Sequence, residues 1–250
     1  MPTRSSADLH PQRSQAWLSF DVGSRALATV GVALGLGAGS LMVWLDDNAL
    51  LLRASVLYAA GGGVLLWLMV RHFRAPAFGA ANWVTLVRAA LAVLLAAVLG
   101  TTQTPALAWV LVGLGTAAVA LDGVDGALAR RRDQASAFGA RFDMETDALL
   151  ILVLAALVWQ QGKAGAWILA AGLLRYLFVA GSFLLPWLGA ELPPSRRRQA
   201  VCVVQIVSLL GALAPVVALP WSAVVALLGL VALVWSFGVD VRWLALKARA

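Results

Sequence analysis

Apolar runs long enough to cross a lipid bilayer follow one another along most of this chain. A membrane-spanning helix needs about 20 mostly apolar residues. The chain is 62% hydrophobic and only 12% charged, against roughly a quarter charged in an ordinary soluble domain. The expected spans are residues 26–45, 52–70, 84–100, 106–127, 144–160, 164–187, 200–219 and 221–239. This pattern excludes a water-soluble globule and predicts an all-α, polytopic membrane protein.

Positive charges fall in alternate connections between these runs. Arg71 and Arg74, the arginines at 130–132 and those at 196–198 lie in one set of connections, and the acidic pair at 46–47 lies in the other. By the positive-inside rule, the arginine-bearing connections and both termini face the cytoplasm, in an inner or plasma membrane. Orientation therefore accounts for the net charge of +7, and no nucleic-acid partner is expected.

The polar N-terminus and the segment 71–82 set the expected domain boundaries. Residues 1–16 are polar and no cleavable signal is evident, so the first apolar run is expected to stay in the protein. The segment RHFRAPAFGAAN, residues 71–82, is too polar to span but carries two phenylalanines. It predicts a short amphipathic helix at the membrane interface. The expected organisation is an accessory transmembrane hairpin in 1–75 and a six-helix catalytic core in 76–250.

Four aspartates lie in the stretch Leu121–Leu150, between two apolar runs. Asp122 and Asp125 are one helical turn apart at the end of the first run. Asp143 and Asp147 are four residues apart at the start of the next run. A short connection can bring these helices antiparallel, with all four carboxylates in one cleft. Because such like charges repel strongly, the arrangement predicts Mg²⁺ or Mn²⁺ and a substrate that carries phosphate.

Small residues and an arginine accompany the aspartates. Gly126, Ala129 and Gly139 leave room for a flat group such as a nucleobase to approach the backbone. Arg130 can bind a phosphate with its forked guanidinium, a geometry that lysine lacks. These neighbours favour a nucleotide diphosphate as the phosphate-bearing group.

Other interpretations of the acidic stretch stay open at this point. One or two carboxylates at a helix end are usually solvated charges, but four at these spacings are not typical of that. Proton and ion relays in membranes also use acidic residues, although those tend to lie at mid-span. The alternatives to an enzyme are a cation transporter or channel and a non-catalytic lipid-binding scaffold.

The acidic stretch also resembles a family signature. It reads Asp122-x-x-Asp125-Gly126-x-x-Ala129-Arg130, then eight residues, then Gly139-x-x-x-Asp143-x-x-x-Asp147. This pattern resembles the signature of the CDP-alcohol phosphatidyltransferases, with every signature position present. The resemblance covers about residues 76–245 and implies the family's six-helix fold, with the first two spans as an addition.

The resemblance implies a reaction and a division of labour. A CDP-linked lipid, usually CDP-diacylglycerol, would donate its phosphatidyl group to an alcohol and release CMP, in phospholipid biosynthesis. Two Mg²⁺ or Mn²⁺ ions would be held by Asp122, Asp125 and Asp143. Asp147 would lie near the ions and act as general base. The family also implies a homodimer in contact with membrane lipid.

The motif NWVTLVR resembles a second family pattern, N-x-x-T-x-x-R, which faces the nucleotide. Asn82, Thr85 and Arg88 recur every three residues, so they share one helix face. Helix capping at the membrane interface is the alternative for Asn82 and Thr85. With the resemblance, the CDP and diphosphate site is expected to include these three residues together with Gly126, Ala129, Arg130 and Gly139.

Arginines outside the signature suggest the acceptor. Arg175 lies in the apolar run AGLLRYLFVAG, where a lone charge is costly and indicates a function. Arg141 neighbours the aspartates, and Arg196, Arg197 and Arg198 precede the seventh run. In a cleft, these cations would favour a phosphorylated polyol such as glycerol 3-phosphate or an inositol phosphate. Snorkelling for Arg175 and positive-inside anchoring for the triple arginine are the alternatives.

No covalent intermediate is expected. The acidic stretch contains Ser136 and no other serine, cysteine or histidine. The only cysteine, Cys202, lies in an apolar run, which excludes an intramolecular disulfide and predicts a packed thiol. Direct attack by the acceptor alcohol is therefore the expected chemistry.

Overall fold

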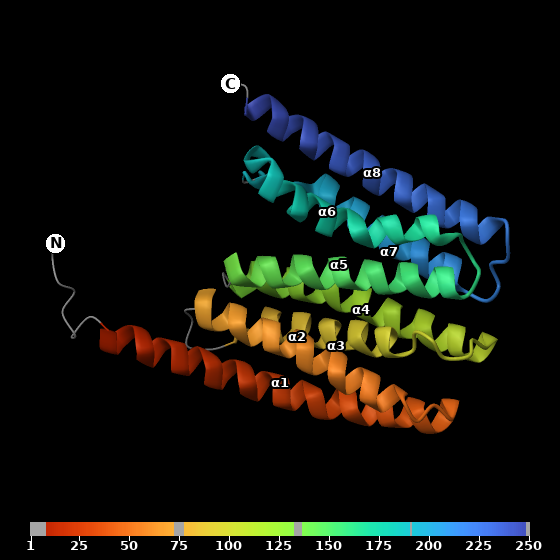
Figure 1. Ribbon diagram of the computed structural model, residues 1–250, viewed down its shortest axis with the longest axis horizontal. Coiled ribbons are helices and arrows are strands. Elements are labelled where there is room, and N and C mark those ends of the chain that lie inside the picture. Colours follow the sequence, from red (N-terminus) through yellow and green to blue (C-terminus); the bar gives the residue numbers. More distant parts are fainter. Residues whose placement is uncertain (1–8, 73–77, 133–136, 191, 249–250) are drawn as a thin grey trace. The chain divides into compact units, whose positions relative to one another are not determined.

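Helices make up the described part of the chain, and it contains no strand. The computed structural model describes residues 9–72, 78–132, 137–190 and 192–248, with the side chains at 9–19, 72, 124–132 and 137 outside the description. The elements are α1 (Leu9–Leu45), α2 (Leu50–His72), α3 (Ala80–Ala97), α4 (Pro105–Arg132), α5 (Ala137–Gln160), η2 (Ala166–Leu169), α6 (Ala170–Leu184), η3 (Pro186–Gly189), α7 (Arg196–Leu213) and α8 (Trp221–Lys247) (Figure 1). Every expected span coincides with a helical element, so the all-α prediction is confirmed.

Within this part of the chain, six helices are long and apolar enough to cross a membrane. They are α1 from Phe20 onward, α2, α3, α4, α6 with its preceding turn, and α8. Helices α5 and α7, which lie at two of the eight expected spans, are not among these six, because charged residues near their starts make them less apolar. Large apolar side chains point outward, with Val43 76% and Leu184 84% exposed. Such surfaces are suited to lipid, and the chain is a multi-pass membrane protein.

Local sequence signals set several helix ends. Thr104 caps α4, since its Oγ1 accepts a hydrogen bond from the Leu107 N–H at 3.1 Å, and Pro105 takes the first helical position. At the end of α5, Gly162 has a φ of 65°. There the N–H of Gly162 donates to Trp159 and the N–H of Lys163 to Val158. This is a Schellman motif, and its left-handed residue explains the glycine.

The chain divides into two compact units. The first comprises residues 1–98 and 121–144. In it, α1, α2 and α3 pack on one another. Tyr58 of α2 lies against Gly31 of α1 and donates a hydrogen bond to the Leu27 carbonyl at 2.9 Å. The same unit contains the C-terminal part of α4 and the first turns of α5, which carry Asp122 and Asp143.

The second unit comprises residues 99–120 and 145–250. Helix α8 packs on α7, on α6 and on both 3₁₀ turns. Gly172 of α6 lies so close to Leu152 of α5 that a Cβ at position 172 would overlap the Leu152 backbone. Small residues allow this kind of close helix packing in membranes.

The interfacial helix expected at 71–82 stays a prediction. Arg71 and His72 end α2, and Ala80 begins α3. Phe78 and Gly79 are not helical, and residues 73–77 lie outside the described residues.

Candidate active site

Arg88 of α3 lies between carboxylates from two other helices. Its side chain is 1% exposed, and its Nη1 forms an ion pair with Asp122 Oδ1 of α4 at 2.8 Å. The same nitrogen donates a hydrogen bond to Asp143 Oδ1 of α5. A guanidinium removed from water needs such charged acceptors. Arg88 therefore joins three helices at the level of the acidic stretch.

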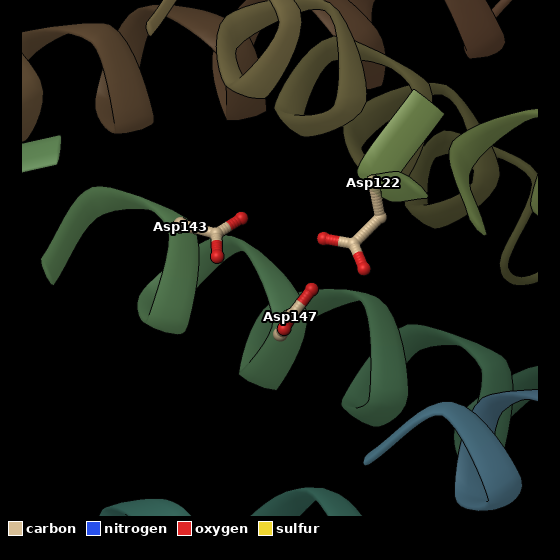
Figure 2. Close-up of side chains that lie close together, drawn as sticks. All are labelled: Asp122, Asp143 and Asp147. Atoms are coloured by element: carbon tan, nitrogen blue, oxygen red, sulfur yellow. The ribbon is translucent and has the colours of Figure 1, made fainter. Parts of the chain in front are cut away.

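Asp122, Asp143 and Asp147 present three carboxylates close together (Figure 2). Each offers one oxygen, and these oxygens lie within 4.8 Å of one another. Asp147 belongs to the second unit. It follows Asp143 by one turn of the continuous helix α5, so the helix itself places these two residues beside each other. All three are half-buried. The side chain of Asp125, the fourth aspartate, lies outside the described residues.

The donor set suits a hard divalent cation. Carboxylate oxygens are the ligands that Mg²⁺ and Mn²⁺ favour. Mg²⁺ binds oxygens at about 2.0–2.1 Å, so ligands on opposite sides of the ion are roughly 4 Å apart. The observed separations, all within 4.8 Å, need only small side-chain adjustments to reach this. Partial exposure leaves space for the water and phosphate oxygens that Mg²⁺ usually retains.

Helix α7 contacts the Asp147 carboxylate within the second unit. Cys202 Sγ donates a hydrogen bond to Asp147 Oδ2 at 3.6 Å. A thiol is a weak donor, so the contact stabilises the Asp147 carboxylate only slightly. The sequence suggested only a packed thiol at this position, and the structure gives it a polar acceptor.

Asn82 and Thr85 are buried at the start of α3. The Asn82 side-chain amide donates a hydrogen bond to the Phe78 carbonyl, and Thr85 Oγ1 donates to the Ala81 carbonyl at 3.1 Å. Both bonds run to backbone four residues earlier. They therefore fasten the first turn of α3 and the segment before it, beside any role toward a nucleotide.

The family comparison agrees with this arrangement. Residues 78–236, more than half of the chain, match the family described as CDP-alcohol phosphatidyltransferase. The chain belongs to this family. Its members transfer a phosphatidyl group from a CDP-alcohol to an alcohol. The match begins just before α3 and ends within α8, so Arg88 and the aspartates lie inside it and α1 and α2 lie outside.

Neither a curated protein nor a solved structure matches this chain. The family assignment therefore rests on residues 78–236 and on the signature that they contain.

The structure describes only some of the other signature positions of this chain. Gly126, Ala129 and Arg130 lie in α4, in the part whose side chains are outside the description. Gly139 lies in the first turn of α5 and is half-buried. Arg141, on the same helix, is exposed.

Arg175, a predicted acceptor residue, forms an ion pair with a residue that the sequence interpretation passed over. Its Nη2 lies 2.5 Å from Glu145 Oε1 of α5. Glu145 precedes Asp147 by two residues, so the Arg175–Glu145 pair lies near Asp147, the aspartate that belongs to the second unit. This partner explains how an arginine is accommodated within an apolar run.

The triple arginine is largely engaged with α8. Arg197 Nη1 donates to the Ser236 carbonyl at 2.5 Å and to Ser236 Oγ at 2.6 Å, and its Nη2 bonds Asp240 Oδ1. Arg198 Nη1 donates to Asp240 Oδ1 at 3.4 Å, and its Nη2 donates to the Pro193 carbonyl. Arg196 is exposed. Arg197 and Arg198 thus fasten the start of α7 to α8.

Asp240 is the main polar residue that the sequence interpretation missed. It is 8% exposed and accepts hydrogen bonds from Arg197 and Arg198. A signal was available, because a carboxylate in a membrane helix needs a cation, but the sequence does not say which arginine supplies it.

Proposed function

We propose that this chain transfers the phosphatidyl group of CDP-diacylglycerol to a phosphorylated alcohol, with Mg²⁺ or Mn²⁺ at the aspartates. The observation that carries the proposal is the group of carboxylate oxygens from Asp122, Asp143 and Asp147, all within 4.8 Å of one another. Such a group fits the charge of a diphosphate only when divalent cations lie between them.

Asp122, Asp143 and Asp147 would hold the metal, and the resemblance adds Asp125. A bound divalent cation supplies Lewis-acid neutralisation of diphosphate charge and helps to orient the reacting groups. The family resemblance suggests two ions. The sequence pattern places Arg130, Gly126, Ala129 and Gly139 around the same diphosphate and its nucleoside.

Asp147 is the proposed general base. The acceptor hydroxyl forms a new P–O bond to the phosphorus that carries diacylglycerol, and its proton passes to the Asp147 carboxylate. The P–O bond of the diphosphate bridge breaks, and CMP leaves with the bonding electrons. Cys202 orients the Asp147 carboxylate through its hydrogen bond at 3.6 Å. General-base assistance is worth about 10²- to 10⁴-fold.

Transfer is proposed to be direct, without a phosphatidyl-enzyme. The acidic stretch contains one serine, Ser136, and no cysteine or histidine. Cys202, the only cysteine, contacts Asp147, so Cys202→Ala tests this point. The variant should still release CMP in the presence of acceptor. Loss of all transfer, together with a lipid adduct trapped on Cys202 of the unmodified protein, would contradict direct attack.

The acceptor is proposed to carry phosphate, as glycerol 3-phosphate and inositol phosphate do. Arg175 is the leading candidate to hold it, because its partner in the described part of the chain, Glu145, is itself half-exposed. Arg141 and Arg196 are exposed and can add charge. Arg197 and Arg198 can assist through the donors that Asp240 and Ser236 leave unused.

The nucleotide side is proposed to involve the buried start of α3. Asn82 and Thr85 share a face with Arg88, and their backbone bonds hold that turn in place. The distribution of arginines supports a site and both termini on the cytoplasmic side of an inner or plasma membrane.

Residues 1–75 are proposed to form an accessory hairpin on a core of residues 76–250. The family match beginning at residue 78 supports that boundary. A homodimer in membrane lipid is the proposed assembly, on the strength of the family resemblance.

The test is an acceptor screen with purified protein in lipid nanodiscs. Labelled CDP-diacylglycerol is incubated with Mn²⁺ or Mg²⁺ and glycerol 3-phosphate, inositol phosphate, serine, choline or phosphatidylglycerol. The expected result is CMP release and a labelled phospholipid with a phosphorylated acceptor. A product formed only with serine or choline would contradict the proposed acceptor class. Cation flux without CMP release would instead support the transporter alternative.

A further inference from the structure

One nitrogen of Arg88 contacts a carboxylate on each of two other helices. Nη1 forms an ion pair with Asp122 Oδ1 at 2.8 Å and also bonds Asp143 Oδ1. The two aspartates come from different helices, α4 and α5, and all three residues belong to the first unit. Arg88 therefore bonds two carboxylates that lie on different helices, so no single helix fixes the distance between them.

Arg88 differs from its two carboxylate partners in exposure. Only 1% of its side chain is exposed, whereas the side chains of Asp122 and Asp143 are 31% and 41% exposed. A residue so enclosed presents little surface to a nucleotide. The exposed portions of the two carboxylates remain accessible to a ligand.

Electrostatics explains why such a residue is needed. Two carboxylates at this distance repel each other, and the repulsion is stronger where water is partly excluded. A fixed cation that bonds one oxygen of each carboxylate offsets the repulsion. It also leaves each carboxylate a second oxygen for another ligand.

We propose that Arg88 is a positioning residue that holds Asp122 and Asp143 at the separation a divalent cation requires. The proposal rests on the metal site described under the proposed function. It replaces the expectation, drawn from the N-x-x-T-x-x-R resemblance, that Arg88 acts by contacting the nucleotide. Groups that orient metal ligands in this way typically affect metal affinity by about 10- to 100-fold.

The test is a Mn²⁺ titration of purified full-length protein in nanodiscs, with free Mn²⁺ measured by electron paramagnetic resonance. Arg88→Gln should weaken Mn²⁺ binding by about 10- to 100-fold. At saturating Mn²⁺ it should bind CMP as the unmodified protein does. The matched control is Arg53→Gln, which removes a half-buried arginine that is also paired with an aspartate, Asp47, outside the family match. The control should leave Mn²⁺ affinity unchanged.

Several results would overturn the proposal. In the first, Arg88→Gln binds Mn²⁺ normally but loses CMP affinity, which indicates a nucleotide contact. In the second, Arg88→Gln binds Mn²⁺ more tightly, which indicates a competing cation. If Arg88→Gln does not fold, Arg88→Lys decides, because it keeps the buried charge but has a shorter side chain without the planar fork. Arg88→Lys should bind Mn²⁺ more weakly, and unchanged affinity in that variant is the third overturning result.

The same titration separates this inference from the proposed function. The unmodified protein should bind Mn²⁺ at a site that Asp122→Asn weakens. Absence of such a site would overturn the proposed metal-dependent function and this inference with it. A normal Asp122-dependent site that is insensitive to Arg88 substitutions would overturn this inference alone.

Discussion

Helix α5 has two chemically different ends. Near its start, Glu145 pairs with Arg175 at 2.5 Å, and Asp147 accepts a hydrogen bond from Cys202. At its far end, Gln160 accepts a hydrogen bond from the Gly100 N–H at 2.8 Å and donates one to the Thr101 carbonyl at 3.2 Å. Charged groups dominate the first end and neutral amides the second.

The amide end continues into the loop after α5. Gln161 donates a hydrogen bond to Gln103 at 3.0 Å. The Lys163 ammonium donates to the Ala214 carbonyl at 3.2 Å and to the Val217 carbonyl at 2.6 Å, which satisfies the end of α7. The Lys163 carbonyl in turn accepts a bond from Ser222 Oγ at 2.7 Å.

The comparison separates stabilisation from chemistry. Amides and one lysine suffice to fasten loops to helix ends, so the carboxylates at the other end are not needed for that purpose. Placing these carboxylates together costs free energy through mutual repulsion and loss of hydration, and only paired cations offset that cost. Substitutions at the charged end should therefore change transfer, and those at the amide end should change stability alone.

The largest expected effect is at Asp147. Asp147→Asn removes the proposed base and a metal ligand while keeping size, so CMP release should fall by about 10²- to 10⁴-fold. Release from CDP-diacylglycerol with acceptor measures it, and the thermal melt should barely change. An activity close to that of the unmodified protein would show that the charged end is not the reaction site.

Arg197→Gln should cause the next largest change, this time in stability. It leaves the buried Asp240 with Arg198 alone at 3.4 Å, and breaking a buried ion pair costs roughly 3 kcal/mol or more. Unfolding in mixed micelles measures the loss. The double variant Arg197→Gln with Asp240→Asn should recover most of it, because no unpaired charge remains. If the stability of Arg197→Gln equals that of the unmodified protein, the bond between Arg197 and Asp240 does not fasten α7 to α8.

At the amide end, Lys163→Met should lower the free energy of unfolding by about 2 kcal/mol, since two carbonyls lose a charged donor. The rate of CMP release below the melting temperature should stay the same. Unfolding and release assays on one preparation check both statements. A large drop in the rate of CMP release without loss of stability would contradict the proposal that the amide end of α5 serves stability alone.

The smallest effect is expected for Gln160→Ala. The Gly100 N–H and Thr101 carbonyl lose partners at an exposed loop where water can replace them, so the cost should be about 1 kcal/mol. A chemical-denaturation curve measures it, with Glu145→Gln at the other end of α5 as the comparison. A cost of several kcal/mol would mean that the amide end contributes more to stability than hydrogen bonds at an exposed loop should.

Apolar periodicity predicted where the helices lie but not how far they extend. Helix α1 begins at Leu9 and α8 ends at Lys247, both beyond the expected spans. Hydropathy reports only the part of a helix suited to hydrocarbon, whereas backbone hydrogen bonding continues into polar residues. Helix α6 is shorter than expected, because Pro186 follows it and begins η3.

The spacing of the aspartates predicted their convergence, but not their cations. Local helix periodicity places Asp143 and Asp147 on one face, and the structure brings Asp122 to them. That Arg88 bonds two of these aspartates, and Arg197 bonds Asp240, depends on packing between helices distant in sequence. A single sequence gives the charges but not which helix faces which.

Metal dependence tests the central claim most directly. CMP release from CDP-diacylglycerol is measured in excess EDTA and again after Mn²⁺ or Mg²⁺ is returned, for the unmodified protein and for Asp122→Asn. We predict that release stops in EDTA, recovers when the ion is returned to the unmodified protein, and stays low in the variant. Release that persists in EDTA, or that recovers equally in Asp122→Asn, would contradict it.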